Sequence, residues 1–461
     1  MLGTTRVTLA VLGGLLFTAT SALAQPVPDA DPRIVTAVAS VSEARLTQIV
    51  ERLSGFGTRH TLSDTASTAA GIGAARQWIF DELKRTSPKL QVSFDTYKLA
   101  PQGRILREVE LRNVLAILPG RTPRRIYVTA HYDTVSLGAG GQAAAVSRPA
   151  GTPAGDAQLR PDQDFNTPAP GANDNGSGTA LTMELARVLS ESGLEFDATL
   201  VFALWAGEEQ GLIGAHAHAA RIAADKTVVV EADFNNDIIG NSHGGNGVID
   251  AETVRVFSEG PEDSMSRALA RYVLGRAAIY VPSHRIRLMA RHDRFARGSD
   301  HSAFNQRGFP AIVFREANEN FGKQHAATDT IDGVDFAYLA QNTRVNVASV
   351  ASLALAPPAP RVTNAAGAQP QIGRQPSGYD TSLRWTASSG AVAYRVYWRE
   401  TWTNDWQHSQ VIGNVSEFVL PNVSIDDFVF GVAAIGRDGQ ESVVSAYVSP
   451  LRRDPDVKLA Q

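Results

Sequence analysis

The sequence contains no cysteine. This absence excludes disulfide bonds, zinc sites with sulfur ligands and a catalytic thiol. An excess of charge of either sign is also missing, because 43 Lys and Arg residues face 47 Asp and Glu residues, a formal net charge of −4. Nucleic-acid-binding proteins usually carry a basic excess, so we expect no nucleic-acid partner. The apolar and charged fractions, 43% and 20%, are those of an ordinary globular protein.

Long apolar runs are scarce, and the one of interest lies at the N-terminus. Arg6 precedes an apolar run over residues 7–17, and small residues follow up to Ala24. This pattern is typical of a secretory signal peptide over residues 1–24, and the run is shorter than the roughly 20 residues of a membrane helix. A retained N-terminal anchor is the alternative. We expect a protein of the bacterial periplasm or medium that has no membrane contact once the signal is removed.

Strand-like and helix-like segments alternate through the first three quarters of the chain. Buried strand patterns over residues 126–130, 198–205 and 228–236 alternate with helical patterns such as 177–190 and 334–355. The alternation predicts an α/β domain over residues 25–356, with three α-β-α layers and a mostly parallel mixed sheet. Residues 136–170 have no clear periodicity. This loop either overhangs a cleft or is a plain surface insertion.

The composition changes at residues 357–360, where three of four residues are proline. Short alternating strand patterns follow, which predict a small all-β sandwich over residues 373–461 after a linker at 357–372. Trp385 and residues 428–432 resemble the fibronectin type III pattern. Tyr397, Trp402 and Trp406 leave open a protein or glycan contact, although packing in the core or at a strand edge is the simpler interpretation.

Acidic residues and histidines stand where the predicted strands end. His131 and Asp133 follow the strand at 126–130, and Asp174 lies in a glycine-rich segment before a helix. Ligands bind at the carboxyl ends of strands in α/β sheets. Taken singly, however, the first pair could simply close a strand end, and the second segment could be a turn that caps the helix.

Two adjacent carboxylates, Glu208 and Glu209, follow the apolar strand pattern at 198–205. Near a buried strand end they lose solvation and repel each other, unless a cation neutralises one and the other handles a proton. The alternative is a solvated pair in the first turn of a helix. Asp237, after the strand at 228–236, and His325, before the last helix, are weak signals when each is considered alone.

Together, these segments resemble a known family. The ordered motifs HYDT, GANDNGSG, GEE, NNDIIG and HAATDT are similar to those of the co-catalytic di-zinc aminopeptidases, which include bacterial leucine-type aminopeptidases. Glutaminyl cyclases and glutamate carboxypeptidases are relatives of that family. The segments RGSDH and GFPA resemble its SDH and G-[IYF]-PA segment. The similarity covers about residues 40–356.

The resemblance implies a site with two zinc ions and a peptide substrate with a free N-terminus. It assigns His131 and Asp237 to one ion, Glu209 and His325 to the other, Asp174 as the bridge, Asp133 as the residue that orients His131, and Glu208 as general base. A water between the ions would be the nucleophile, and the acidic cluster would bind the substrate α-amine. The family also has a cis peptide bond after the bridging aspartate, here Asp174–Asn175.

Some relatives carry a tyrosine just before the last histidine ligand, where it donates to the oxyanion. Gln324 stands there in this chain, so oxyanion stabilisation from this position would be weaker. A glutaminyl cyclase with one zinc, another exopeptidase or a non-catalytic binding protein of the same fold remain alternatives. Metal stoichiometry would separate the first of these from the aminopeptidase.

Overall fold

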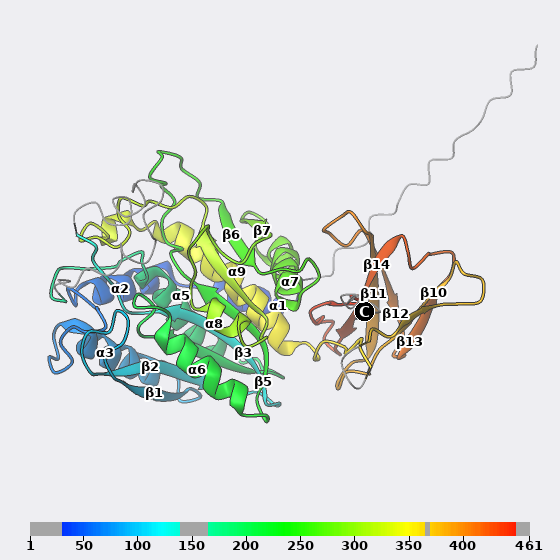
Figure 1. Ribbon diagram of the computed structural model, residues 1–461, viewed down its shortest axis with the longest axis horizontal. Coiled ribbons are helices and arrows are strands. Elements are labelled where there is room, and N and C mark those ends of the chain that lie inside the picture. The colour runs from blue at the N-terminus through cyan, green and yellow to red at the C-terminus, as the bar shows by residue number, and fades with distance from the viewer. Residues whose placement is uncertain (1–29, 139–164, 365–368, 449–461) are drawn as a thin grey trace, which may run out of the picture.

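A computed structural model describes residues 30–138, 165–364 and 369–448 (Figure 1). The predicted signal peptide and most of the loop at 136–170 lie outside these ranges. In the part of the chain that is described, no helix has both the length and the apolar character needed to cross a membrane.

A mixed sheet of eight strands forms the centre of the larger part of the molecule. Its order is β1 (Gln91–Leu99), β2 (Val109–Leu118), β4 (Thr199–Trp205), β3 (Arg124–His131), β5 (Val229–Asn236), β8 (Ala311–Glu316), β6 (Thr253–Ser258) and β7 (Arg285–Met289). The central strands β4, β3, β5 and β8 are parallel, whereas the pairs β1–β2, β2–β4 and β8–β6 are antiparallel. The predicted α/β class with a mostly parallel mixed sheet is confirmed.

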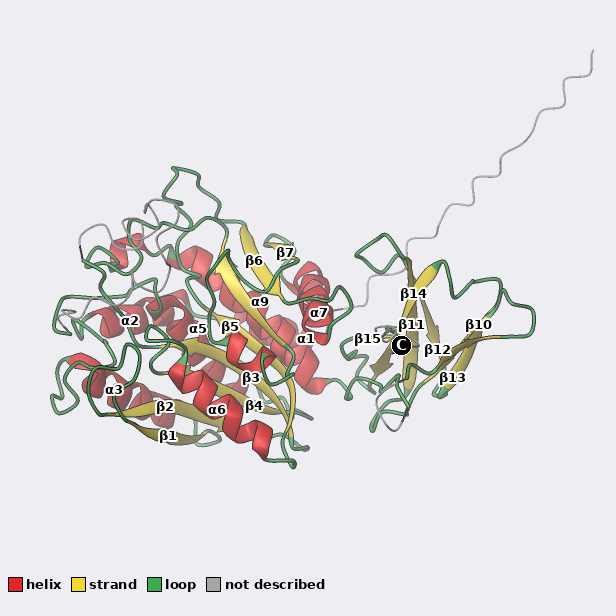
Figure 2. Ribbon diagram, in the orientation of Figure 1, coloured by secondary structure: helices red, strands yellow, loops and turns green. Residues whose placement is uncertain are grey.

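Helices cover both faces of this sheet (Figure 2). One face carries α1 (Pro32–Ala39), α2 (Glu43–Ser54), α3 (Gly71–Thr86), α5 (Gly176–Glu191), α7 (Met265–Tyr280) and α9 (Phe336–Leu355), and the other carries α6 (Ile213–Ala224) and α8 (His301–Asn305). Alternate residues of one strand enter different cores: Phe202 belongs to the larger core, and Val201 packs in the smaller one under α6. Burial on both faces explains why β4 is apolar from Leu200 to Trp205.

The C-terminal residues form two antiparallel sheets. One contains β13 (Glu417–Leu420), β10 (Thr381–Arg384) and β9 (Ile372–Arg374), and the other contains β12 (His408–Ile412), β11 (Ala393–Glu400), β14 (Phe428–Ile435) and β15 (Ser445–Ala446). They enclose a core of their own that includes Trp385, Tyr394 and Phe430. Of the three aromatics considered for partner contact, Trp402 is 75% exposed, whereas Tyr397 and Trp406 are half-buried.

The C-terminal sheets are docked on the larger part of the molecule. Arg399 donates to Asp263 over 2.6 Å, and Gln440 donates to Asp31 over 3.2 Å. Val443 belongs to the larger hydrophobic core. Polar and apolar contacts therefore both join the two parts.

Candidate functional site

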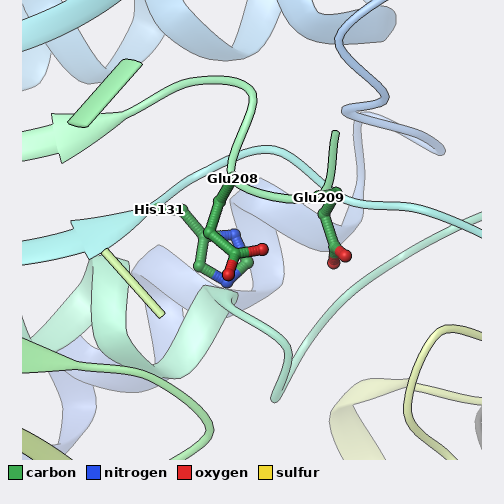
Figure 3. A group of neighbouring side chains, drawn as sticks. All are labelled: His131, Glu208 and Glu209. Atoms are coloured by element: carbon green, nitrogen blue, oxygen red, sulfur yellow. The ribbon is translucent and has the colours of Figure 1, made fainter. Parts of the chain in front are cut away.

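Three parallel neighbouring strands bring the first candidate residues to one edge of the sheet. His131 is the last residue of β3, Glu208 and Glu209 follow β4, and Asp237 follows β5. Figure 3 shows His131 beside Glu208 and Glu209, which the adjacent strand supplies. Parallel strands end at the same edge, so residues as far apart in the chain as His131 and Asp237 come together here.

The glycine-rich segment before α5 brings Asp174 to the same edge. A Cβ on Gly178 would lie 2.2 Å from the backbone oxygen of Asn236, so glycine alone permits this approach of α5 to the end of β5. Asp329 accepts hydrogen bonds from the backbone amides of Asn173 (3.0 Å) and Asp174 (2.8 Å). The peptide bond Asp174–Asn175 is cis, as the resemblance implied.

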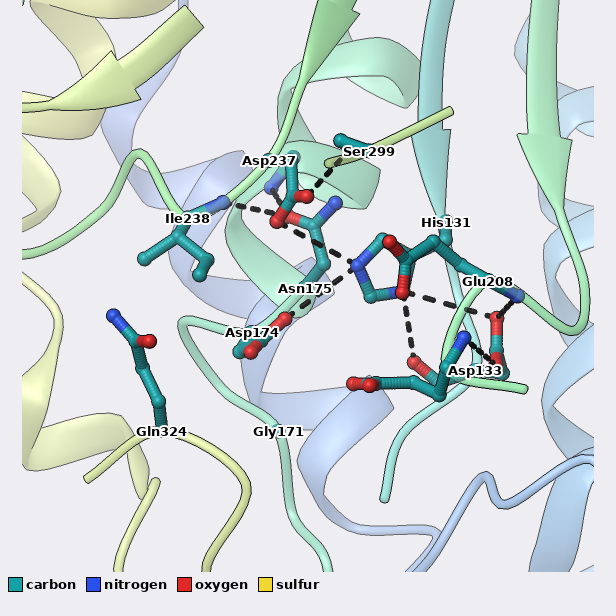
Figure 4. A network of polar contacts seen from close by, with 12 residues as sticks. His131, Asp133, Gly171, Asp174, Asn175, Glu208, Asp237, Ile238, Ser299 and Gln324 are labelled. Carbon is teal, nitrogen blue, oxygen red and sulfur yellow. Dashed lines mark hydrogen bonds and ion pairs between the residues drawn. The ribbon is translucent and has the colours of Figure 1, made fainter. Parts of the chain in front are cut away.

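Asp174 is shared by two groups of potential metal ligands (Figure 4). Its Oδ1 lies 3.5 Å from Nε2 of His131, which is 3.6 Å from Oδ1 of Asp237. Its Oδ2 lies 3.0 Å from Nε2 of His325, which is 3.3 Å from Oε2 of Glu209. Within each group of three residues, the donor atoms lie within 4.8 Å of one another. Each group could therefore hold one metal ion.

The chemistry of the donor set fits zinc. Oδ2 of Asp174, Oε1 of Glu209 and Oδ1 of Asp237 are buried and accept no hydrogen bond of suitable geometry from the described residues, although the His325 imidazole lies 3.0 Å from Oδ2 of Asp174. Leaving a buried acceptor unpaired costs about 1–3 kcal/mol, more for a charged group. Carboxylate oxygens and imidazole nitrogens without sulfur are ligands that zinc accepts. A bound cation would satisfy all three oxygens.

The charges in the cluster are strongly coupled. Burial would raise the pKa of Asp174, but His325 and His131 hold it well below its usual value. Burial, Asp174 and Glu208 all raise the pKa of Glu209 well above its usual value. The imidazoles do not neutralise every carboxyl group, and a divalent cation would supply the missing positive charge.

Glu208 has the properties of a proton carrier. Burial raises its pKa to about 7, and the neighbouring carboxylates add to this effect although His131 opposes it. A group with a pKa near neutrality can both accept and return a proton. Asp300 lies fully buried within electrostatic reach of Glu208, and burial and that charge raise its own pKa.

Asp133 joins His131 to the loop that carries the two glutamates. Nδ1 of His131 donates to the backbone oxygen of Asp133 at 3.1 Å, and the carboxylate lies at 3.7 Å. That carboxylate accepts the backbone amides of Glu208 and Glu209, both at 3.2 Å. Its contact with His131 is therefore the longer one, and its hydrogen bonds go mainly to the loop.

The sequence analysis assigned no role to two residues that hold Asp237, although one of them, Ser299, lies in the segment RGSDH. Oδ2 of Asp237 accepts a hydrogen bond from Ser299 at 2.6 Å and forms an ion pair with Arg315 at 2.9 Å. Burial would raise the pKa of Asp237, but Arg315 lowers it strongly. The other oxygen, Oδ1, remains directed to His131. The available signal was Arg315 itself, a charged residue within the buried strand β8.

A buried polar ladder continues from Ser299 into the sheet. Asn235 donates to Ser299 at 2.8 Å, and the hydroxyl of Thr129 lies 3.1 Å from Asn235 Oδ1 and 2.8 Å from Asp233 Oδ1. Burial raises the pKa of Asp233 to about 8. Asp233 and Asn235 of β5 and Asp237, which directly follows the strand, occupy alternate positions, so they lie on one side of it.

Arg59 is a further residue that the sequence analysis did not identify. Its fully buried guanidinium donates to the backbone oxygens of Tyr132 (2.7 Å), Pro170 (2.6 Å) and Gly171 (2.9 Å). It thereby ties the segment after His131 to the segment before Asp174, two parts of the site that are distant in sequence.

Comparison with known proteins places this site in a family. Residues 113–350 match Peptidase family M28. The chain belongs to this family. A probable zinc metalloprotease of Leptosphaeria maculans is 35% identical, over 91% of this chain and 97% of the relative. A probable zinc metalloprotease of Pyricularia oryzae is also 35% identical, over 90% of this chain and 84% of its own length. The M28 chain is therefore a peptidase, and its substrates are peptides.

Solved structures confirm the fold. The Legionella pneumophila LapA aminopeptidase has a TM-score of 0.52 and 19% identity, covering 70% of this M28 chain and 75% of that chain. The Porphyromonas gingivalis glutaminyl cyclase has a TM-score of 0.51 and 16% identity, and the match covers 68% of this chain and 98% of the cyclase. At such identities the likeness concerns the fold alone.

Proposed function

We propose that this M28 peptidase is a zinc aminopeptidase that holds two zinc ions and removes the N-terminal residue of peptides. The observation that carries the proposal is the position of Asp174, whose two oxygens face two histidine-containing groups. One ion would be held by His131, Asp174 and Asp237. The second would be held by Asp174, Glu209 and His325.

The surroundings of Asp237 favour two ions over one. Arg315 keeps Asp237 ionised, and Ser299 binds the same oxygen as Arg315. The remaining oxygen, Oδ1, is buried without a hydrogen bond among the described residues and lies beside His131. An ionised ligand with a free oxygen is suited to a metal ion, and this supports occupancy of the His131 group.

Zinc bound in such a site polarises the scissile carbonyl and lowers the pKa of water. The chain supplies the proton transfers, since Glu208 can accept the proton of the attacking water and return it to the leaving amine. Asp133 holds the main chain of Glu208 in place through its amide. The acidic cluster would bind the α-ammonium group of the substrate, which favours cleavage at the N-terminus.

Gln324 is not assigned to the oxyanion. Its Nε2 donates to Glu319 at 3.1 Å, and its Oε1 accepts from Arg297 at 3.3 Å. Both ends of the amide are engaged with neighbours, and the side chain is 2% exposed. In this proposal the polarisation of the carbonyl therefore depends on the metal ions rather than on Gln324.

The substitution Glu208→Gln tests the proposal. We expect native protein to contain two zinc ions per chain and to hydrolyse aminoacyl-anilides but not their N-acetylated forms. The variant should keep its zinc and lose about 10²- to 10⁴-fold in kcat, because it lacks the proton carrier. Metal analysis and anilide turnover provide the measurements.

Other outcomes would exclude this proposal. Equal cleavage of N-acetylated substrates would show that the α-amine is not recognised. One zinc together with cyclisation of N-terminal glutamine would favour a glutaminyl cyclase-like activity. Intact zinc sites without turnover of any peptide would favour a binding protein.

We also propose that the enzyme is exported to the bacterial periplasm or medium after loss of residues 1–24. The pattern of one basic residue, an apolar run and small residues before Gln25 supports this. Sequencing the N-terminus of the mature protein would test it, and a retained Met1 would contradict it.

A further inference from the structure

Three arginines converge on one buried carboxylate near the candidate metal centre. The carboxylate of Glu319 forms ion pairs with Nη2 of Arg255 at 2.7 Å, Nη1 of Arg294 at 2.8 Å and Nη1 of Arg297 at 3.1 Å. The Glu319 side chain is only 4% exposed. Arg315 lies beside this group, between Asp237 and Asp293, at 2.9 Å from each carboxylate.

This cluster has more cations than anions. Its four guanidinium groups face three carboxylates, those of Glu319, Asp293 and Asp237, so one positive charge has no carboxylate within the cluster. Asp237 would in addition share its charge with a metal ion. Arg297 has the most exposed side chain of the four arginines, at 19%. The uncompensated charge is therefore accessible at Arg297.

One edge of the Arg297 guanidinium is held and the other is free. Nη1 donates to Glu319 and to Oε1 of Gln324, whereas Nε and Nη2 donate to no residue in the described ranges. These two atoms are not buried, so they reach solvent. The ring of Phe321, itself 39% exposed, packs 5.7 Å from Cζ. A guanidinium fixed on one side presents a fork suited to a carboxylate on the other.

Arg297 lies beside the site of the reaction. Its partner Gln324 directly precedes His325, and Figure 4 shows Gln324 across Asp174 from Glu208. A small recess adjoins Gln324, and every side chain that lines it is polar, among them Asn173, Asn320 and Lys323. The side of the centre opposite the general base is therefore polar and positively charged.

We propose that the free edge of Arg297 binds a carboxylate of the substrate, which makes peptides with an N-terminal glutamate or aspartate preferred substrates. This inference rests on the proposed aminopeptidase function. The acidic cluster would hold the α-ammonium group, and the first side chain would extend towards Gln324 and Arg297. The carboxylate that Arg297 binds could instead be the C-terminal carboxylate of a dipeptide. Experiments can distinguish a side-chain carboxylate from a C-terminal one.

The test compares zinc-loaded native protein with Arg297→Gln and Arg297→Lys. Substrates are Glu-Ala-amide, Gln-Ala-amide and Leu-Ala-amide, together with Ala-Ala in its free-acid and amidated forms. We expect native protein to favour glutamate over the uncharged isostere glutamine by about tenfold or more in kcat/KM, the size of one charged hydrogen bond. Arg297→Gln should abolish the preference mainly through KM, and Arg297→Lys should keep part of it.

Arg291→Gln is the matched control, because Arg291 is an exposed arginine of the same segment that packs on Phe295. It should leave the preference unchanged. A preference for free Ala-Ala over its amide that disappears in Arg297→Gln would assign the carboxylate to the C-terminus. A preference for glutamate that survives in Arg297→Gln, or no preference for any carboxylate, would overturn the inference.

A binding measurement separates this inference from the proposed function. In Glu208→Gln, calorimetry should show tighter binding of free glutamate than of free glutamine, and adding Arg297→Gln should remove the difference. This result does not require turnover. Failure to hydrolyse any peptide would contradict the aminopeptidase proposal, whereas equal affinity for the two amino acids would contradict the role of Arg297.

Discussion

At the scale of single residues, the properties of a ligand depend on partners that are far away in sequence. Asp237 is ionised because Arg315 faces it, and its orientation depends on Ser299. Ser299 in turn accepts a hydrogen bond from Asn235, which belongs to the buried ladder that ends at Asp233. Protonation of Asp233, in this ladder, should affect the stability of the protein in a way that can be measured.

Asp233 should make the stability of the protein depend on pH. Its pKa is about 8 in the folded chain and about 4 in an unfolded one. Between these values the unfolded chain releases the proton while the folded chain keeps it. The contribution of Asp233 to the free energy of unfolding is therefore fully present below about pH 4 and is lost as the pH rises towards 8. Asp233→Asn should therefore gain stability relative to native protein across this range, as measured by urea unfolding.

The comparison uses the difference between the two proteins, because other buried acids are common to both. Glu231, for example, has a pKa raised to about 7 by burial, although Arg124 opposes the shift. A difference in the free energy of unfolding that is independent of pH from 4 to 8 would show that Asp233 is ionised in the folded protein.

At the scale of elements, the site depends on how closely α5 approaches the end of β5. Gly178 permits that approach, and Asn175 reinforces it by donating to the backbone oxygen of Asn236 at 2.9 Å. The same contact positions Asp174 next to Asp237. The packing of α5 against the end of β5 therefore also determines where Asp174 and Asp237 lie.

Gly178→Ala should damage both stability and metal binding. The new Cβ would meet a backbone oxygen at 2.2 Å, which cannot move without shifting β5. We expect a loss of roughly 1–3 kcal/mol in the free energy of unfolding, with weaker zinc binding in a competition assay against a chelator.

Gly275→Ala is the matched control for that substitution. Gly275 lies in α7, and a Cβ added there would meet nothing within 4 Å outside the backbone of the helix itself. Alanine is the better helix former, so this variant should be neutral or slightly stabilised. If Gly178→Ala behaved like the control, the close approach of α5 would not be required.

At the scale of the whole molecule, the C-terminal sheets are joined to the peptidase part by a buried ion pair. The Arg399 side chain is 2% exposed, and its partner Asp263 lies 2.6 Å away in the segment before α7. A second pair between the two parts, Arg33–Asp438, is more exposed. A role of these sheets in contact with a protein or glycan stays a prediction, with the exposed Trp402 as the residue to examine.

Asp263→Ala should loosen this attachment. Removing one partner of a buried pair leaves the Arg399 charge uncompensated, at a cost of roughly 3–5 kcal/mol. We expect calorimetry to show a lower unfolding temperature, with the C-terminal sheets unfolding in a separate, earlier transition.

Glu417→Ala provides the comparison, since Glu417 pairs with Arg384 on the surface, where both side chains are at least 66% exposed. Such pairs contribute little, so its unfolding should match that of native protein. A native-like profile for Asp263→Ala would show that apolar contacts such as those of Val443 carry the attachment.

Much of the fold could be predicted because it depends on local patterns. The apolar run of β4 and the helical spacing of α5 and α9 each lie within a few turns of chain, and their alternation implies a parallel sheet covered on both faces. Four of the residues proposed as ligands stand at the end of a strand or in a glycine-rich segment, namely His131, Asp174, Glu209 and Asp237. His325 has no such local signal and was assigned only through the resemblance to the family.

The sequence by itself determined which residue types stand at the ends of the strands, and thereby the family. Only the tertiary structure decided what holds those residues and what surrounds them. Ser299 and Arg315 lie 62 and 78 positions from Asp237, and the arginines that pair with Glu319 come from two separate segments, β6 and the loop after β7. Such partners leave no periodic pattern in the chain, because hydrogen bonds and ion pairs between loops depend on distance in space and not on spacing in sequence.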